Sequence, residues 1–148
     1  MIRHTVIAQL HEDVWKLLEP ERGGMAQRIL IIEDNVDNRE LLTDALEFAG
    51  YTIAQAKDGV EGEAKAKEWK PDLILLDISL PLKSGWEVAR ALQEESTREI
   101  PIIALTAHAR EEDRQRALET GCRSYLPKPV KPKDVIREIQ KLLQPLEP

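Results

Sequence analysis

The chain of 148 residues contains a single cysteine, Cys122, and few aromatic residues. One cysteine excludes an intrachain disulfide and any metal cluster held by several thiolates. Aromatic residues make up 4% of the sequence, so the core must consist mainly of Ile, Leu, Val and Ala. Long apolar runs are also missing, and none approaches the roughly 20 residues of a membrane-spanning helix. Charged residues interrupt the first apolar stretch, which argues against a secretory signal: they are Glu12, Asp13 and Lys16.

Basic residues are outnumbered in this sequence. There are 21 Lys and Arg residues against 27 Asp and Glu residues, which gives a net charge of −6. Non-specific binding to nucleic acid requires a basic surface, so we expect no direct contact with nucleic acid. The chain is 42% apolar and 32% charged, the balance of a folded soluble domain. We therefore expect a cytoplasmic protein without membrane attachment.

The first 24 residues differ from the remainder. Apolar residues recur there at near-helical spacing: Val6, Leu10, Val14 and Leu17. This spacing predicts a short amphipathic helix over 5–18, and residues 19–24 contain the Pro and Gly typical of a linker. Two hypotheses remain open: the helix is a docking or dimerisation element, or the natural chain begins at Met25 and the preceding part is a misassigned start. The predicted organisation is an N-terminal extension over 1–24 and one domain over 25–148.

From residue 28 onward, apolar segments alternate with helical patterns. The predicted strands are Arg28–Ile32, Tyr51–Ala56, Asp72–Leu76, Pro101–Leu105 and Arg123–Leu126. Asn35 or Asp37 can cap the helix after the first strand, and Ser84 can cap the helix after the third. Five such units in a row predict an α/β fold, in which helices cover both faces of a doubly wound parallel sheet.

Polar residues with complementary chemistry follow four of these strands. Glu33 and Asp34 follow the first, Asp77 the third, Thr106 the fourth and Lys128 the fifth. Ligands of such sheets bind outside the carboxyl ends of the strands. Three converging carboxylates need a cation, and oxygen ligands with room for water suit Mg²⁺. An aspartate can act as a nucleophile toward phosphorus, while a hydroxyl and an ammonium group stabilise the phosphoryl oxygens.

The segments around these residues resemble the receiver domain of response regulators in two-component signalling. The matching segments are ILIIEDN at 29–35, PDLILLDISLPLKSG at 71–85, PIIALTAHA at 101–109 and YLPKP at 125–129. Each segment is weak evidence alone, but together they occupy the correct positions in order over about 27–144. The resemblance implies a flavodoxin-like (βα)5 fold with strand order 2-1-3-4-5, in a stand-alone regulator of the single-domain type.

The resemblance also implies a role for each residue at the strand ends. Asp77 resembles the phosphoacceptor, and the expected ligands of Mg²⁺ are Glu33, Asp34, Asp77 and the backbone carbonyl of Ser79. Lys128 resembles the phosphate-binding lysine, preceding a proline in a cis peptide bond. Thr106 resembles the switch hydroxyl.

Two further residues have open interpretations. Tyr125 stands at the position of the family's switch aromatic, although a half-buried strand tyrosine needs no switching role. His108 could tune hydrolysis of the acyl phosphate, or it could be a solvated loop histidine.

The expected partners also follow from the resemblance. A sensor histidine kinase or a histidine phosphotransfer protein would supply the phosphoryl group. A downstream protein would bind the surface formed by the helix over 110–120, the fifth strand and the last helix. That helix begins with REEDRQR at 110–116, which lacks an apolar anchor and therefore favours mobility. We expect a monomer or a phosphorylation-dependent dimer.

Other function classes fit the sequence less well. An aspartate-nucleophile phosphatase usually has a second Asp two residues after the nucleophile, where this chain has Ser79. A dinucleotide-binding fold would need G-x-G-x-x-G after the first strand. The expected protein is thus not a metabolic enzyme, and it catalyses only its own phosphorylation and dephosphorylation. The alternative is a receiver-fold scaffold or phosphate-shuttle module whose phosphorylation is not its main output.

Overall fold

The computed structural model describes residues 26–108 and 110–143, and strands and helices alternate along the chain. The strands are β1 (Arg28–Ile32), β2 (Thr52–Ala56), β3 (Leu73–Asp77), β4 (Ile102–Thr106) and β5 (Ser124–Pro127). The helices are α3 (Val36–Phe48), α4 (Gly59–Trp69), α5 (Gly85–Ala91), α6 (Glu111–Glu119) and α7 (Pro132–Leu143). The helix predicted over 5–18 and the two hypotheses on the first 24 residues lie outside the described residues.

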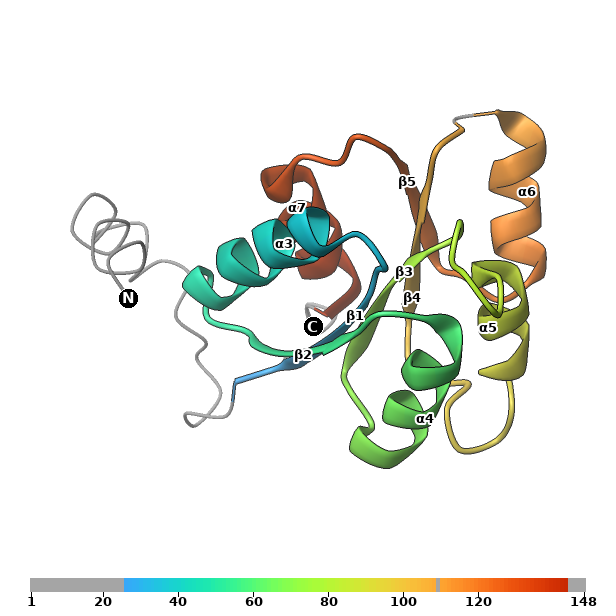
Figure 1. Cartoon of the computed structure of the whole chain (residues 1–148), viewed down its shortest axis with the longest axis horizontal. Coiled ribbons are helices and arrows are strands. Elements are labelled where there is room, and N and C mark those ends of the chain that lie inside the picture. Colours follow the sequence, from blue (N-terminus) through green and yellow to red (C-terminus); the bar gives the residue numbers. More distant parts are fainter. Residues whose placement is uncertain (1–25, 109, 144–148) are drawn as a thin grey trace, which may run out of the picture.

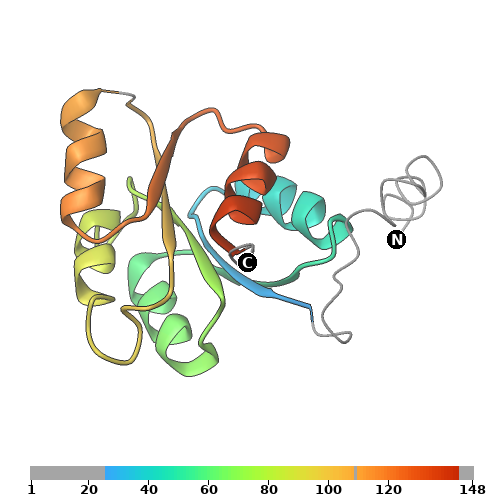
Figure 2. The same cartoon turned by 180° about the vertical axis from the view of Figure 1, so that it is seen from behind.

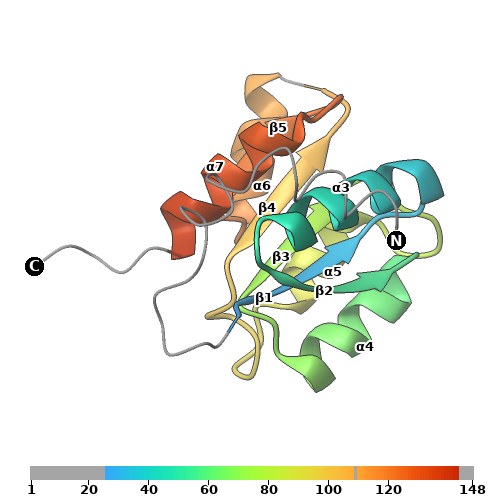
Figure 3. The ribbon, with the colours of Figure 1, turned by 90° about the vertical axis from the view of Figure 1, so that its left-hand side faces the viewer.

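All five strands form one parallel sheet in the order β2-β1-β3-β4-β5, which confirms the predicted topology. Figure 3 shows the strands running toward the same edge of the sheet. β3 lies at the centre, with Leu76 paired to Ile32 of β1 and to Ala104 of β4. The strand order therefore places the ends of β1, β3 and β4 side by side, as a site at this edge requires.

The central strands run one residue further than predicted. Asp77 and Thr106 are the last residues of β3 and β4, so our placement of them after the strands was wrong by one position. Backbone bonds continue past the apolar runs, because Ile78 N–H donates to the carbonyl of Leu105 and Lys128 N–H donates to that of Thr106. Both side chains are thereby held by the sheet instead of by a loop.

Side-chain caps begin three of the helices. Asn35, and not Asp37, caps α3 by accepting a hydrogen bond from the backbone N–H of Asn38 at 2.8 Å. Asp58 and Ser84 cap α4 and α5 in the same way. Such caps satisfy N–H groups that lack a partner within the helix. Arg110, the N-cap residue of α6, makes no side-chain capping hydrogen bond within the described part of the chain, so the first turn of α6 is held less firmly.

The two faces of the sheet bury two separate apolar clusters. α3 and α7 cover one face, and α4, α5 and α6 cover the other, as Figures 1 and 2 show from opposite sides. Alternate residues of each strand point to opposite faces. Ile29 and Ile31 thus pack with Leu42, Val135 and Ile139, while Leu30 and Ile32 pack under the other three helices. Burial on both faces explains the unbroken apolar runs in the sequence.

The last two helices differ in how they are anchored. α7 buries Val135 and Ile139 completely, whereas the buried residue of α6 is Ala117 and its neighbour Leu118 is 49% exposed. A helix held by one small side chain is a weakly attached element. None of the helices in the described residues is long and apolar enough to cross a bilayer.

Replacing Ile139 by Ala should lower the free energy of unfolding by about 2–5 kcal/mol, because the side chain is fully buried. Leu118→Ala is the control on the weakly attached helix, and its exposed position predicts a loss of about 0.5 kcal/mol. Urea denaturation followed by circular dichroism measures both values. Equal losses for the two variants would contradict the difference in anchoring.

Candidate functional site

The site lies at the carboxyl edge of the sheet, where Lys128 makes ion pairs with two buried carboxylates. Its Nζ lies 3.2 Å from Glu33 Oε1 and 3.1 Å from Asp77 Oδ1. Glu33 is 1% exposed and Asp77 is 2% exposed. Buried charges are strongly destabilising without a partner, so this ammonium group allows the two acids to occupy neighbouring strand ends.

Burial and neighbouring charges act in opposite directions on the ionisation of this group. Burial, together with the nearby charge of Asp77, raises the pKa of Glu33 to about 7, although the N–H of Asn35 and the ammonium of Lys128 act in the opposite direction. Burial alone would lower the pKa of Lys128, but the carboxylates of Asp77 and Glu33 outweigh it and raise that pKa. Lys128 therefore remains charged at neutral pH, while burial disfavours the ionised form of Glu33.

These carboxylates also fit a metal ion. Oxygens of Glu33, Asp34 and Asp77 lie within 4.8 Å of one another, and Asp34 is exposed to solvent. An all-oxygen set with one side open to water suits a hard divalent cation such as Mg²⁺. A cation would favour the ionised form of Glu33, which burial disfavours. The structure thus brings together the three predicted metal-binding side chains.

The other predicted residues lie around this group. Ser79 N–H donates to Asp77 Oδ1 at 3.0 Å, so its backbone is beside the carboxylate. The Thr106 hydroxyl accepts a hydrogen bond from the N–H of His108 at 3.2 Å, and the Thr106 carbonyl accepts one from Lys128 N–H at 2.7 Å. Thr106 is therefore tied to Lys128 through the backbone.

Tyr125 occupies the position on β5 that the sequence predicted for it. Its half-buried ring packs against the core under α4, α5 and α6. It pairs in register with Ala104, two residues before Thr106 on β4. The Lys128–Pro129 peptide bond is cis, which confirms that prediction.

Two residues at the site were not assigned a role from the sequence. Arg39 Nη1 donates to the carbonyl of Glu33 at 2.8 Å and to that of Asp34 at 3.5 Å, so it holds the backbone of the acidic pair. Gly85 packs directly against the end of β3, because a Cβ there would lie 2.6 Å from the carbonyl oxygen of Asp77. The signal for Gly85 was its place at the end of the matching segment, whereas the sequence carried no comparable signal for Arg39.

The chain is similar to curated proteins and to a family model over most of its described length. Residues 29–140 match the model of the response regulator receiver domain. The phosphate regulon transcriptional regulatory protein PhoB of Escherichia coli is 42% identical over 125 residues, which are 84% of this chain and 55% of PhoB. This chain thus spans about half the length of that relative. The polar-differentiation response regulator DivK of Brucella ovis is 40% identical over 120 residues, 80% of this chain and 98% of DivK.

Solved structures show the same fold. The chemotaxis response regulator CheY4 of Vibrio cholerae is 29% identical with a TM-score of 0.76, covering 80% of this chain and 100% of CheY4. The receiver domain of the sensor histidine kinase PA1611 of Pseudomonas aeruginosa was solved with a magnesium ion in its active-site cleft. It is 35% identical with a TM-score of 0.74 and covers 80% of this chain and 98% of that structure. With its parallel sheet and acidic cluster, this chain belongs to the response regulator receiver domain family, whose members are phospho-accepting signalling domains and not metabolic enzymes.

Proposed function

We propose that Asp77 accepts a phosphoryl group in a Mg²⁺-dependent reaction and that the phosphorylated domain signals to a partner protein. The observation that carries this proposal is the buried ion-pair group, in which Lys128 contacts Asp77 and Glu33 while Asp34 lies within reach of the same cation position. A carboxylate with a fixed ammonium and a metal position beside it has what acyl-phosphate formation requires. The proposed donor is a sensor histidine kinase or a histidine phosphotransfer protein.

In the proposed reaction a carboxylate oxygen of Asp77 attacks the phosphorus of a phosphohistidine. The new P–O bond forms as the P–N bond breaks, and the imidazole nitrogen keeps the electron pair and takes up a proton. The N–H of Ser79 orients the Asp77 carboxylate through Oδ1. Bound Mg²⁺, held by the three acidic side chains and the Ser79 carbonyl, would offset the charge of the phosphoryl oxygens. Lys128 would then exchange its contact with Asp77 for one with the phosphoryl group.

The response would involve Thr106, Tyr125 and the weakly anchored helix α6. In this proposal the Thr106 hydroxyl moves toward the phosphoryl group and Tyr125 follows into the space behind it. The surface of α6, β5 and α7 then changes shape, because the ligand biases a two-state element. A hollow of about 230 Å³ on this surface supports a protein-binding role, and it is lined by Arg114, Ala117, Leu118, Arg123, Ser124 and Tyr125.

Phosphorylation by a small donor tests the chemistry without a kinase. Radiolabelled acetyl phosphate and Mg²⁺ should label the wild-type protein at close to one phosphate per chain, and Asp77→Ala should abolish labelling. Asp72→Asn, at the opposite end of the same strand segment, is the matched control and should retain it. Wild-type protein that takes no label, or Asp77→Ala that labels fully, would refute the assignment.

Lys128→Ala should separate metal binding from phosphoryl binding. Because the acidic ligands remain, Mg²⁺ affinity measured by calorimetry should change by less than about tenfold, whereas phosphorylation at saturating Mg²⁺ should slow by about 10²-fold or more. Lys131→Ala removes an exposed lysine of the same loop and should leave both values unchanged. An unchanged rate in Lys128→Ala would remove this residue from the proposed reaction.

Hydrogen exchange tests the switch. With Mg²⁺ and a stable phosphoryl mimic, amide exchange in the segment from Thr106 to Tyr125 should change, while exchange in β1 should stay constant because that strand is buried on both faces. The comparison is made by mass spectrometry on the same protein with and without the mimic. Equal exchange of the segment in both states would argue against a switch built on α6.

A further inference from the structure

The loop between β3 and α5 contains a strained residue close to the proposed phosphoacceptor. Leu82 has a φ of 68°, in the left-handed region that a branched side chain rarely adopts, and it is 82% exposed. Such a conformation persists where the surrounding structure holds it, and it occurs often at functional sites. The same loop carries Ser79, whose carbonyl is a proposed metal ligand. The contacts that hold this loop therefore influence the position of the Ser79 carbonyl.

Lys83 fixes the loop to α4 through both its side chain and its backbone. Its Nζ makes an ion pair and hydrogen bond with Glu63 Oε2. Its carbonyl packs so closely on the start of α4 that a Cβ at Gly59 would lie 2.5 Å from it. Its N–H donates to the Pro81 carbonyl at 2.7 Å, which closes the turn around Leu82. These three contacts lock the residue that follows the strained position.

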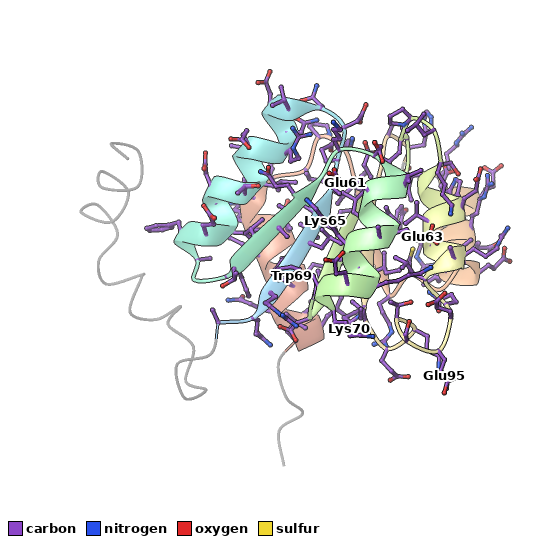
Figure 4. All side chains as sticks on the ribbon, turned by 60° about the horizontal axis from the view of Figure 1, so that its bottom comes forward. Glu61, Glu63, Lys65, Trp69, Lys70 and Glu95 are labelled. Carbon is purple, nitrogen blue, oxygen red and sulfur yellow. The ribbon has the colours of Figure 1, made fainter. Side chains whose placement is uncertain are left out.

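Glu63 is well suited to hold this lysine. It lies on the side of α4 that faces α5, as Figure 4 shows, whereas Glu61 and Lys65 lie on the side of β2. Its side chain is 17% exposed and also pairs with Lys67 at 3.2 Å. The hydrogen bond from Lys83 lowers the pKa of Glu63, and the weaker effect of the hydrogen bond from Lys67 acts in the same direction. Burial opposes both effects. The carboxylate therefore stays ionised, and the pair is more enclosed than an ordinary surface ion pair.

The two ends of the loop are joined beside the end of β3. Gly85 N–H donates to the Ile78 carbonyl at 2.9 Å, and Gly85 packs on the Asp77 carbonyl. The loop is thus closed by the hydrogen bond between Gly85 and Ile78, and Lys83, two residues before Gly85, holds it to α4. Loss of the Lys83 contact would leave the strained turn without its side-chain support.

We propose that the Lys83–Glu63 ion pair is a clamp that positions the Ser79 carbonyl for the metal ion, so that both residues act as positioning residues for Mg²⁺ binding and phosphoryl acceptance. This inference rests on the proposed function. By this proposal α4 contributes to the Mg²⁺ affinity of the site. The three metal-binding side chains, Glu33, Asp34 and Asp77, lie outside that helix. Residues that orient metal ligands from outside the coordination shell influence affinity strongly.

The test compares variants that remove the Lys83–Glu63 ion pair with a variant that keeps it. Lys83→Met and Glu63→Gln should each raise the Mg²⁺ Kd by about tenfold, whereas Lys83→Arg, which keeps the ion pair, should stay within about twofold of wild type. Glu94→Gln is the matched control, because it removes the outer partner of Lys67 and leaves the clamp intact. Calorimetry gives the Kd for Mg²⁺ alone, and acetyl phosphate labelling gives the rate at limiting Mg²⁺.

Stability measurements separate positioning from simple support of the fold. Urea midpoints are recorded for all four variants. If Lys83→Met lowers the midpoint but binds Mg²⁺ with wild-type affinity, the pair merely joins α4 to the loop and the proposal is overturned. A different result would overturn the proposed function: wild-type protein that binds Mg²⁺ but takes no label on Asp77. In that case a Kd that still rises in Lys83→Met and Glu63→Gln would continue to support the clamp for metal binding.

Discussion

The contact of one ammonium group with two buried carboxylates is the constraint on which the rest of the site depends. Glu33 directly follows β1 and Asp77 ends the neighbouring β3 at the centre of the sheet, where almost no solvent reaches them. Their mutual repulsion and loss of hydration would destabilise the fold. Lys128 supplies the compensating charge from beyond β5, and its backbone is joined to the end of β4. Burial still raises the pKa of Glu33 despite this contact. A divalent cation beside the three carboxylates would favour the ionised form of Glu33.

A rigid centre of the sheet and a weakly attached helix beside it together suit a signalling domain. β3 and β4 are buried along their whole length, so the proposed acceptor Asp77 and the hydroxyl of Thr106 have fixed starting positions. The helix α6 is polar, lacks a side-chain cap within the described residues and is held mainly by Ala117. A small displacement at a stiff site can shift such an element between two arrangements. The contrast in anchoring between α6 and α7 thus gives the proposed response a physical basis.

The fold and the position of the site could be predicted from the sequence, because apolar runs identify buried parallel strands and the residues after them must meet at one edge. The error of one residue at Asp77 and Thr106 arose because the ladder continues through backbone bonds that do not depend on apolar side chains. Arg39 and the Lys83–Glu63 pair could not be predicted. They join segments whose distance in space depends on loop geometry, and charged residues on a helix usually face solvent. The left-handed Leu82 was equally hidden, since its side chain disfavours that conformation.

A crystal structure of the protein with Mg²⁺ and beryllium fluoride, a mimic of the phosphoryl group, would test the proposed site most directly. We expect one Mg²⁺ between Glu33, Asp34 and Asp77, with the fluoride complex on the Asp77 carboxylate and the Lys128 ammonium turned toward a fluorine. Density for the metal at that position would show that the three carboxylates hold a cation as proposed. A fluoride complex bound to another residue, or Lys128 still pairing with Asp77 at a site without metal under saturating Mg²⁺, would contradict it.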